Sequence, residues 1–91
     1  MSVRVRIPTP LRQATDGEAE LSLDAPTVAS VISELETRYP AIRGRLRDDS
    51  GALRRFVNLY VNGQDVRFQN GLETSLKAGD ELSIVPAVAG G

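Results

Sequence analysis

Hydrophobic and polar residues alternate near the start of the chain, and this period of two predicts a strand with one buried face. Val3, Val5 and Ile7 form the hydrophobic set, and two arginines stand between them. A second alternating segment, residues 18–23, follows a turn-like Thr-Asp-Gly sequence and predicts the partner strand of a hairpin. Its charged residues favour a position at the edge of a sheet.

The hydrophobic period then becomes that of an amphipathic helix. One face carries hydrophobic residues at positions i, i+3, i+4, i+7 and i+11, namely Val28, Val31, Ile32, Leu35 and Tyr39. Thr27 is placed to cap the first amides of this helix, and Pro40 ends it. We expect residues 41–46 to add a short helical turn before a polar loop at 47–51.

Strand-like patterns return in the second half of the chain. The segment 56–61 divides into two faces, with Val57, Leu59 and Val61 on one and Phe56, Asn58 and Tyr60 on the other. Asn62-Gly63 predicts a tight turn into a strand over 64–68. Phe68 is favoured as a core residue beneath this hairpin. The last strand is predicted at 81–85, with Leu82 and Ile84 on its buried side.

The predicted order of elements is strand, strand, helix, strand, strand, strand. It favours an α+β class in which one sheet is covered on one face by one helix. The other face would then carry Arg4, Arg6, Phe56, Asn58, Tyr60, Ser83 and Val85. Aromatic and aliphatic groups beside arginines favour a docking surface there, and an ordinary solvated face is the alternative.

Composition argues against several kinds of function. The 91 residues include no cysteine and no histidine, so thiolate nucleophiles, the usual general base and the commonest metal ligands are missing. Glu34, Glu36, Asp48 and Asp49 lack any spacing that identifies an enzyme site. Six arginines lie between residues 38 and 55, but a net charge of −1 and a pI near 5.3 disfavour a nucleic-acid binder. Without a signal-peptide or membrane-spanning pattern, we expect a cytoplasmic protein that is monomeric when free.

The final residues have unusually small side chains: Ala87, Val88, Ala89, Gly90 and Gly91. Pro86 has no amide hydrogen, so it is expected to end the strand pairing and release a flexible tail at 87–91 from a domain at 1–86. Glycines without a Cβ can be threaded into a narrow slot. A carboxylate is a poor electrophile, so chemistry at Gly91 requires activation, most simply by ATP to an acyl-adenylate. A frayed terminus is the alternative.

Together these features resemble the ThiS/MoaD group of ubiquitin-like sulfur carrier proteins. The resemblance lies in the order of elements, in Leu-Lys-Ala-Gly-Asp-Glu-Leu at 76–82 and in Val-Pro-Ala-Val-Ala-Gly-Gly at 85–91. Within the group, residues 56–62 and 66–68 are most similar to the CysO branch, which supplies sulfur for cysteine synthesis. The resemblance implies a β-grasp fold, with a mixed sheet of four to five strands packed on one main helix.

The resemblance also implies a carrier that partner enzymes act on, with no catalytic residue, metal or bound cofactor of its own. An E1-like activating enzyme would adenylate Gly91 with ATP, and a sulfurtransferase step would replace AMP by sulfur to give a thiocarboxylate. A PLP-dependent cysteine synthase would then take the sulfur, and a JAMM-type zinc metalloprotease would release the product. Ala87 to Ala89 would form a threading arm, and Gly90 would supply clearance. The docking candidates are Phe56, Tyr60, Phe68 and Val85.

Three alternatives stay open on these residues. A MoaD-like carrier would give its sulfur to molybdopterin synthesis, and a ThiS-like carrier would give it to the thiazole of thiamine. A ubiquitin-like protein modifier would use the same activated glycine to form isopeptide bonds. Lys77 is the only lysine, which leaves little scope for lysine-linked chains of this protein with itself.

Overall fold

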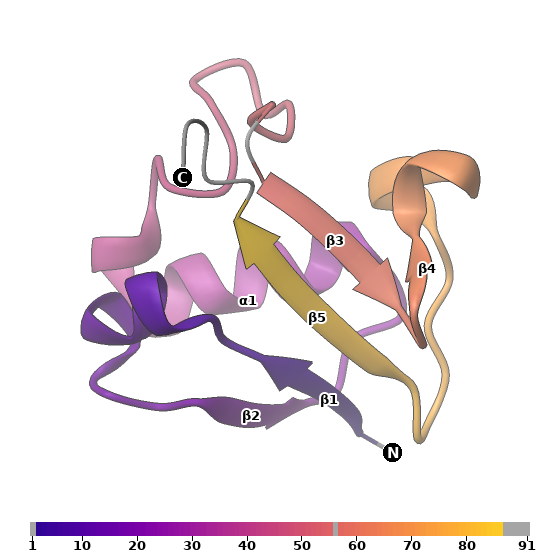
Figure 1. Ribbon diagram of the computed structural model, residues 1–91, viewed down its shortest axis with the longest axis horizontal. Helices are drawn as coiled ribbons and strands as arrows, with labels where there is room; N and C mark the ends of the chain where they lie inside the picture. Colours follow the sequence, from indigo (N-terminus) through magenta and orange to yellow (C-terminus); the bar gives the residue numbers. More distant parts are fainter. Residues whose placement is uncertain (1, 56, 87–91) are drawn as a thin grey trace.

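A computed structural model describes residues 2–55 and 57–86 (Figure 1). The helices and strands, in chain order, are β1 (Val3–Arg6), η1 (Thr9–Thr15), β2 (Glu20–Leu23), α1 (Val28–Arg38), η2 (Pro40–Ile42), β3 (Val57–Val61), β4 (Gln64–Asp65), η3 (Val66–Phe68), η4 (Gly71–Glu73) and β5 (Glu81–Pro86), where η marks a 3-10 helix. Phe56 and the predicted tail at 87–91 lie outside the described residues.

The strands form one sheet in the order β2-β1-β5-β3-β4. The central pair, β1 and β5, is parallel, and the other neighbours are antiparallel, so the sheet is mixed as predicted. The segment at 18–23 contributes β2 at one edge, which confirms its predicted position. The first and last strands of the chain thus lie side by side in the middle of the sheet.

Helix α1 covers one face of this sheet (Figure 1). It begins after Thr27, whose side-chain oxygen accepts a hydrogen bond from the amide of Ser30 at 3.2 Å. The helix buries Val28, Val31, Ile32 and Leu35 against the inward-facing residues of the strands, while Tyr39 is only partly buried. The alternating sets of β1, β3 and β5 are buried as predicted.

Three predicted boundaries differ in the structure. Residues 66–68 form η3 instead of continuing a strand. The carboxylate of Asp65 accepts a hydrogen bond from the amide of Arg67 at 2.8 Å, and this bond starts a 3-10 turn. This turn buries Val66 and leaves Phe68 88% exposed, so the favoured core position of Phe68 is wrong. The short turn expected within 41–46 lies at Pro40–Ile42, and residues 9–15 form η1, an element for which no prediction was made.

None of the helices in the described ranges has the length and apolar character needed to cross a membrane.

Candidate functional site

The candidate site begins at the end of β5, the strand that leads toward residues 87–91. β1 pairs with β5 as far as Ser83, whereas β3 pairs with it from Leu82 to its last residue, with Val57 opposite Pro86. Leu82 and Ile84 anchor β5 in the hydrophobic core. Burial holds the strand at Leu82 and Ile84, and among the described strands only β3 pairs with residues 84–86.

The face of the sheet away from α1 has two halves of different character. On β1 and its neighbours, Arg4 lies 3.8 Å from Glu20 and 3.8 Å from Glu81, and Arg6 lies 3.9 Å from Glu81. These side chains are exposed or half-exposed, so the ion pairs add little stability. They do neutralise the arginines locally, which leaves this half a solvated, charge-balanced surface.

The half on β3 and β5 carries no charge at its centre. The register places Tyr60 opposite Ser83 and Asn58 opposite Val85. Tyr60 is half-buried and Val85 is 41% exposed, so both present apolar surface beside the end of β5. All described residues of the predicted open face therefore lie on the face of the sheet away from α1. The docking candidates Tyr60 and Val85 lie there on neighbouring strands. Phe56 lies outside the described residues.

Phe68 occupies a different place from the other docking candidates. It lies in η3, after the two-residue edge strand β4, and its side chain is almost fully exposed. An exposed phenylalanine has no stabilising role in the core, since its apolar surface stays in water. Phe68 therefore offers apolar surface to a partner at the edge of the sheet, separately from Tyr60 and Val85.

Arg67 positions the start of β3, a role that the sequence patterns did not reveal. Its guanidinium donates hydrogen bonds to the carbonyls of Val57 at 2.9 Å and Arg55 at 3.2 Å. β4 pairs only with Tyr60 and Val61, so it is too short to reach these carbonyls. A side chain therefore replaces the missing strand partner at the position that lies opposite Pro86.

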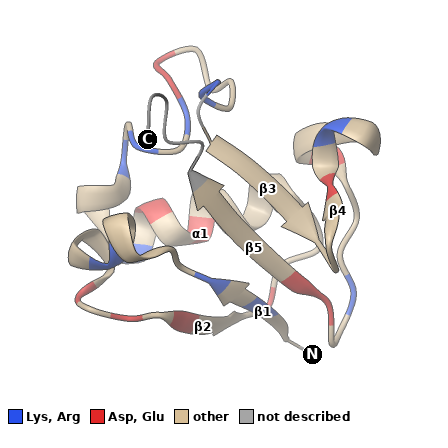
Figure 2. Cartoon of the chain, viewed as in Figure 1, with Lys and Arg blue, Asp and Glu red and all other residues tan. Residues whose placement is uncertain are grey.

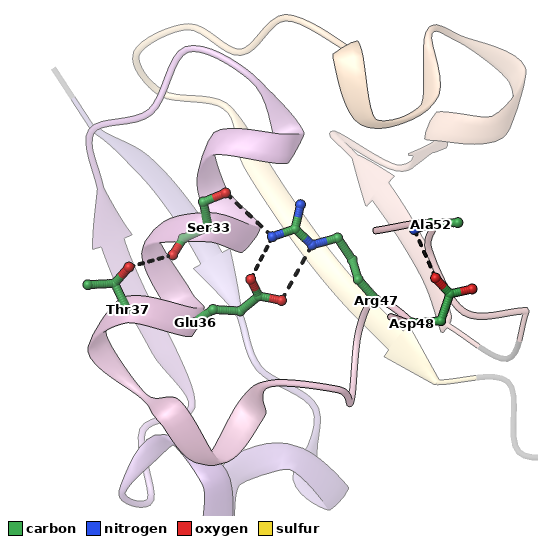
Figure 3. A network of polar contacts seen from close by, with 6 residues as sticks. All are labelled: Ser33, Glu36, Thr37, Arg47, Asp48 and Ala52. Carbon is green, nitrogen blue, oxygen red and sulfur yellow. Dashed lines mark hydrogen bonds and ion pairs between the residues drawn. The ribbon is translucent and has the colours of Figure 1, made fainter. Parts of the chain in front are cut away.

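A structured loop precedes β3 and is attached to α1. The guanidinium of Arg47 donates to both carboxylate oxygens of Glu36 and lies 3.5 Å from Ser33 Oγ (Figure 3). One oxygen of Asp48 accepts from the amides of Ser50 at 2.9 Å and Ala52 at 3.1 Å and from the Ser50 hydroxyl. These hydrogen bonds, that of the hydroxyl above all, hold the pKa of Asp48 below its usual range.

The described part of the chain presents surfaces for contact and no reacting centre. No group of three metal-ligating side chains is found within residues 2–55 and 57–86. Two carboxyl groups have a lowered pKa, and both are held by hydrogen bonds: Asp48 by Ser50 and Ala52, and Asp80 by Asn62 and Lys77. The structure provides the end of β5, anchored by the core and by β3, beside the uncharged half of the sheet face on β3 and β5.

Comparison with known proteins decides the family. Residues 5–91 match the ThiS family. The chain belongs to the ThiS family. It is 52% identical over 93 aligned residues to the sulfur carrier protein CysO of Mycobacterium tuberculosis, and the alignment covers all of both chains. The predicted resemblance is thereby confirmed.

Solved structures show the same fold. A chain of the BexX/CysO complex from Amycolatopsis orientalis matches with a TM-score of 0.90 at 48% identity, covering 98% of this chain and 99% of that one. Small archaeal modifier protein 1 from Methanosarcina acetivorans matches with a TM-score of 0.88 at 34% identity, covering 99% and 96%. The ThiS-family chain described here thus has the predicted ubiquitin-like β-grasp fold.

These findings confirm the predicted class of function. The ThiS-family chain is a CysO-like sulfur carrier protein, a small carrier rather than an enzyme. Among relatives, the CysO of Amycolatopsis orientalis forms a complex with BexX. The roles of Gly91, of residues 87–90 and of the docking candidates stay predictions.

Proposed function

We propose that this chain carries sulfur as a thiocarboxylate on Gly91 and delivers it for cysteine synthesis in the cytoplasm. The observation that supports this most is the 52% identity to CysO over the whole of both chains. A carboxylate oxygen of Gly91 attacks the α-phosphorus of ATP in an E1-like enzyme, and pyrophosphate leaves. A sulfide-level nucleophile then attacks the carbonyl carbon of the acyl-adenylate, AMP leaves, and the thiocarboxylate remains.

In this proposal the chain itself supplies presentation and docking. The buried Leu82 and Ile84 hold β5 so that residues 87–91 start from a fixed point. The small residues Ala87 to Gly90 thread into partner clefts, and Tyr60 and Val85 contact the surface around each cleft. The partners are the E1-like enzyme with its sulfurtransferase activity, a PLP-dependent cysteine synthase and a JAMM-type zinc metalloprotease.

A protein-modifier function is the second candidate, because small archaeal modifier protein 1 is 34% identical over 99% of this chain. The same adenylate would then react with a lysine amine of a target protein. Lys77 is exposed in the turn before β5, at the opposite end of that strand from Pro86. MoaD-like and ThiS-like delivery use the same thiocarboxylate and differ only in the acceptor enzyme.

The test combines the chain with an activating enzyme from the same genome, ATP and a sulfide source, and measures the intact mass. We expect the mass increase given by exchange of one oxygen for sulfur. Deleting Gly91 should abolish this increase without changing the melting curve, because a terminal residue contributes little burial. Ala89→Gly, which keeps the length and the final carboxylate, is the matched control and should still be charged.

Two results would contradict the proposal. One is the absence of the sulfur mass increase with every activating enzyme of the genome. The other is a covalent link between Gly91 and lysine amines of target proteins as the main product, which would favour the modifier. Transfer of sulfur to O-phosphoserine in the presence of a cysteine synthase would assign the pathway.

A further inference from the structure

Charge is distributed very unevenly over this chain. Residues 43–55 contain five arginines and two aspartates, a net charge of +3, so the rest of the chain carries −4. In Figure 2 the arginines of this segment lie in the loops around the arrowhead of β5. The positive end of the molecule is therefore the end from which residues 87–91 continue.

The fold brings the arginines of this segment together. The amide of Arg54 donates to the carbonyl of Leu46 at 2.9 Å, and the amide of Asp48 donates to that of Ala52 at 2.8 Å. The guanidinium of Arg54 also donates to the carbonyl of Gly44. Residues 43–47 and 53–55 thus lie side by side in antiparallel directions, two residues before the strand position that pairs with Pro86.

Three of these arginines, Arg43, Arg45 and Arg55, have exposed side chains, and we call them the loop arginines. Within the described ranges, none of them has a carboxylate within ion-pair distance. The nearby Asp48 is already held by Ser50 and Ala52. The loop arginines are thus directed to solvent on a segment that hydrogen bonds hold in place.

We propose that the loop arginines dock against an acidic protein surface that surrounds the cleft receiving residues 87–91. This inference rests on the proposed function, because that function requires the end of the chain to enter a partner enzyme. Opposite charges at the rim of an interface speed association and orient the partners. The acidic remainder of the chain would repel an extended polyanion, so an acidic protein surface fits better than nucleic acid.

The experiment compares two charge-removing double variants. Arg43→Gln with Arg45→Gln removes two charges from the loop arginines. Arg4→Gln with Lys77→Gln removes the same charge near the start of β5, the opposite end of the strand from Pro86. Association rates with the activating enzyme are measured at about 50 mM and about 500 mM salt, where screening differs strongly. Thiocarboxylate is quantified by mass in parallel.

We expect the loop double variant to associate roughly 5–10-fold more slowly at low salt, with the difference largely lost at high salt. The control double variant should stay within about twofold of the wild type under both conditions. Arg55→Gln should act in the same direction as the loop double variant. All substituted side chains lie on the surface, so melting curves of the variants should overlay that of the wild type.

The outcomes separate the inference from the proposed function. Equal association rates for all variants, on a wild type that does form thiocarboxylate, overturn the inference and leave the proposed function intact. If the wild type never forms thiocarboxylate, both the inference and the proposed function are overturned. Tight binding of a short fluorescent DNA duplex that the loop double variant loses would overturn the inference by assigning the loop arginines to nucleic acid.

Discussion

Replacing Asp80 by asparagine tests how the turn before β5 is held. Asp80 is only 8% exposed, and its two carboxylate oxygens accept from the side-chain amide of Asn62 and from the backbone amide of Lys77, each at 3.0 Å. Asn62 in turn accepts from the amide of Glu81 at 2.9 Å. The carboxylate therefore joins the β3–β4 turn to the turn that starts the central strand.

The expected cost follows from the donors around Asp80. An asparagine there can accept only one of the two hydrogen bonds, because its own amide group points a donor at the other donor. Losing one hydrogen bond to a buried charged group costs about 2 kcal/mol of unfolding free energy. For a domain of this size, this corresponds to a fall in Tm of roughly 8–16 °C.

The effect should depend on pH in a defined direction. The hydrogen bond from Asn62, followed by that from Lys77, holds the pKa of Asp80 in the folded state below its usual range. A group with a depressed folded pKa stabilises the protein above its unfolded pKa and loses that contribution as the pH falls through the folded pKa. The difference between the wild type and Asp80→Asn should therefore be constant near neutral pH and shrink below about pH 4.

Urea unfolding at neutral pH and near pH 3 measures both effects. Asp24→Asn, which removes the carboxylate of an exposed aspartate, is the matched control and should change stability by less than about 0.5 kcal/mol. The reasoning is refuted if Asp80→Asn costs no more than this control. It is also refuted if the difference from the wild type persists undiminished at acidic pH.

Two further predictions concern the loop and the open face. Glu36→Gln breaks the ion pair with Arg47, in which the two side chains are 17% and 22% exposed. It should lower the free energy of unfolding by about 1 kcal/mol and speed hydrogen exchange at the amide of Asp48. Glu34→Gln, which breaks a more exposed pair, should lower it by less than about 0.5 kcal/mol. Equal effects of these two variants would contradict a special role for the first pair. Tyr60→Glu should weaken binding to the activating enzyme by tens of fold, roughly 2 kcal/mol, at a temperature where its melting curve shows that the variant is folded. Unaltered affinity would exclude the open face as a docking surface.

Local patterns predicted most of the secondary structure. The period of two around Val5 and Leu59 and the helical period around Val31 matched the buried residues, since each element must turn its apolar side to one core. Asn62-Gly63 predicted its turn because both residues adopt positive φ, 51° and 87°. These features depend on residues that are close in sequence, so the sequence contains them.

The exposure of Phe68 and the role of Arg67 could not be read from such patterns. Asp65 starts a 3-10 turn after only two residues of β4, and this turn keeps Val66 buried but leaves Phe68 exposed. The side chain of Arg67 donates hydrogen bonds to the carbonyls of Val57 and Arg55, ten and twelve residues earlier, at and just before the start of β3. Both outcomes depend on where a short edge strand stops, which is a property of the assembled sheet.

By itself, the sequence determined the class of fold, the open face and the small residues at 87–91 on which the proposed chemistry rests. Only the tertiary structure decided that β1 lies parallel to β5, that β3 is the one described strand to accompany the last residues of β5, and that the arginines of residues 43–55 lie in the loops around that strand end. The physical reason is the separation along the chain over which each interaction acts. Periodicity and turn chemistry act between neighbours along the chain, whereas strand pairing and the gathering of charges join segments that are distant in sequence and meet only when the core forms.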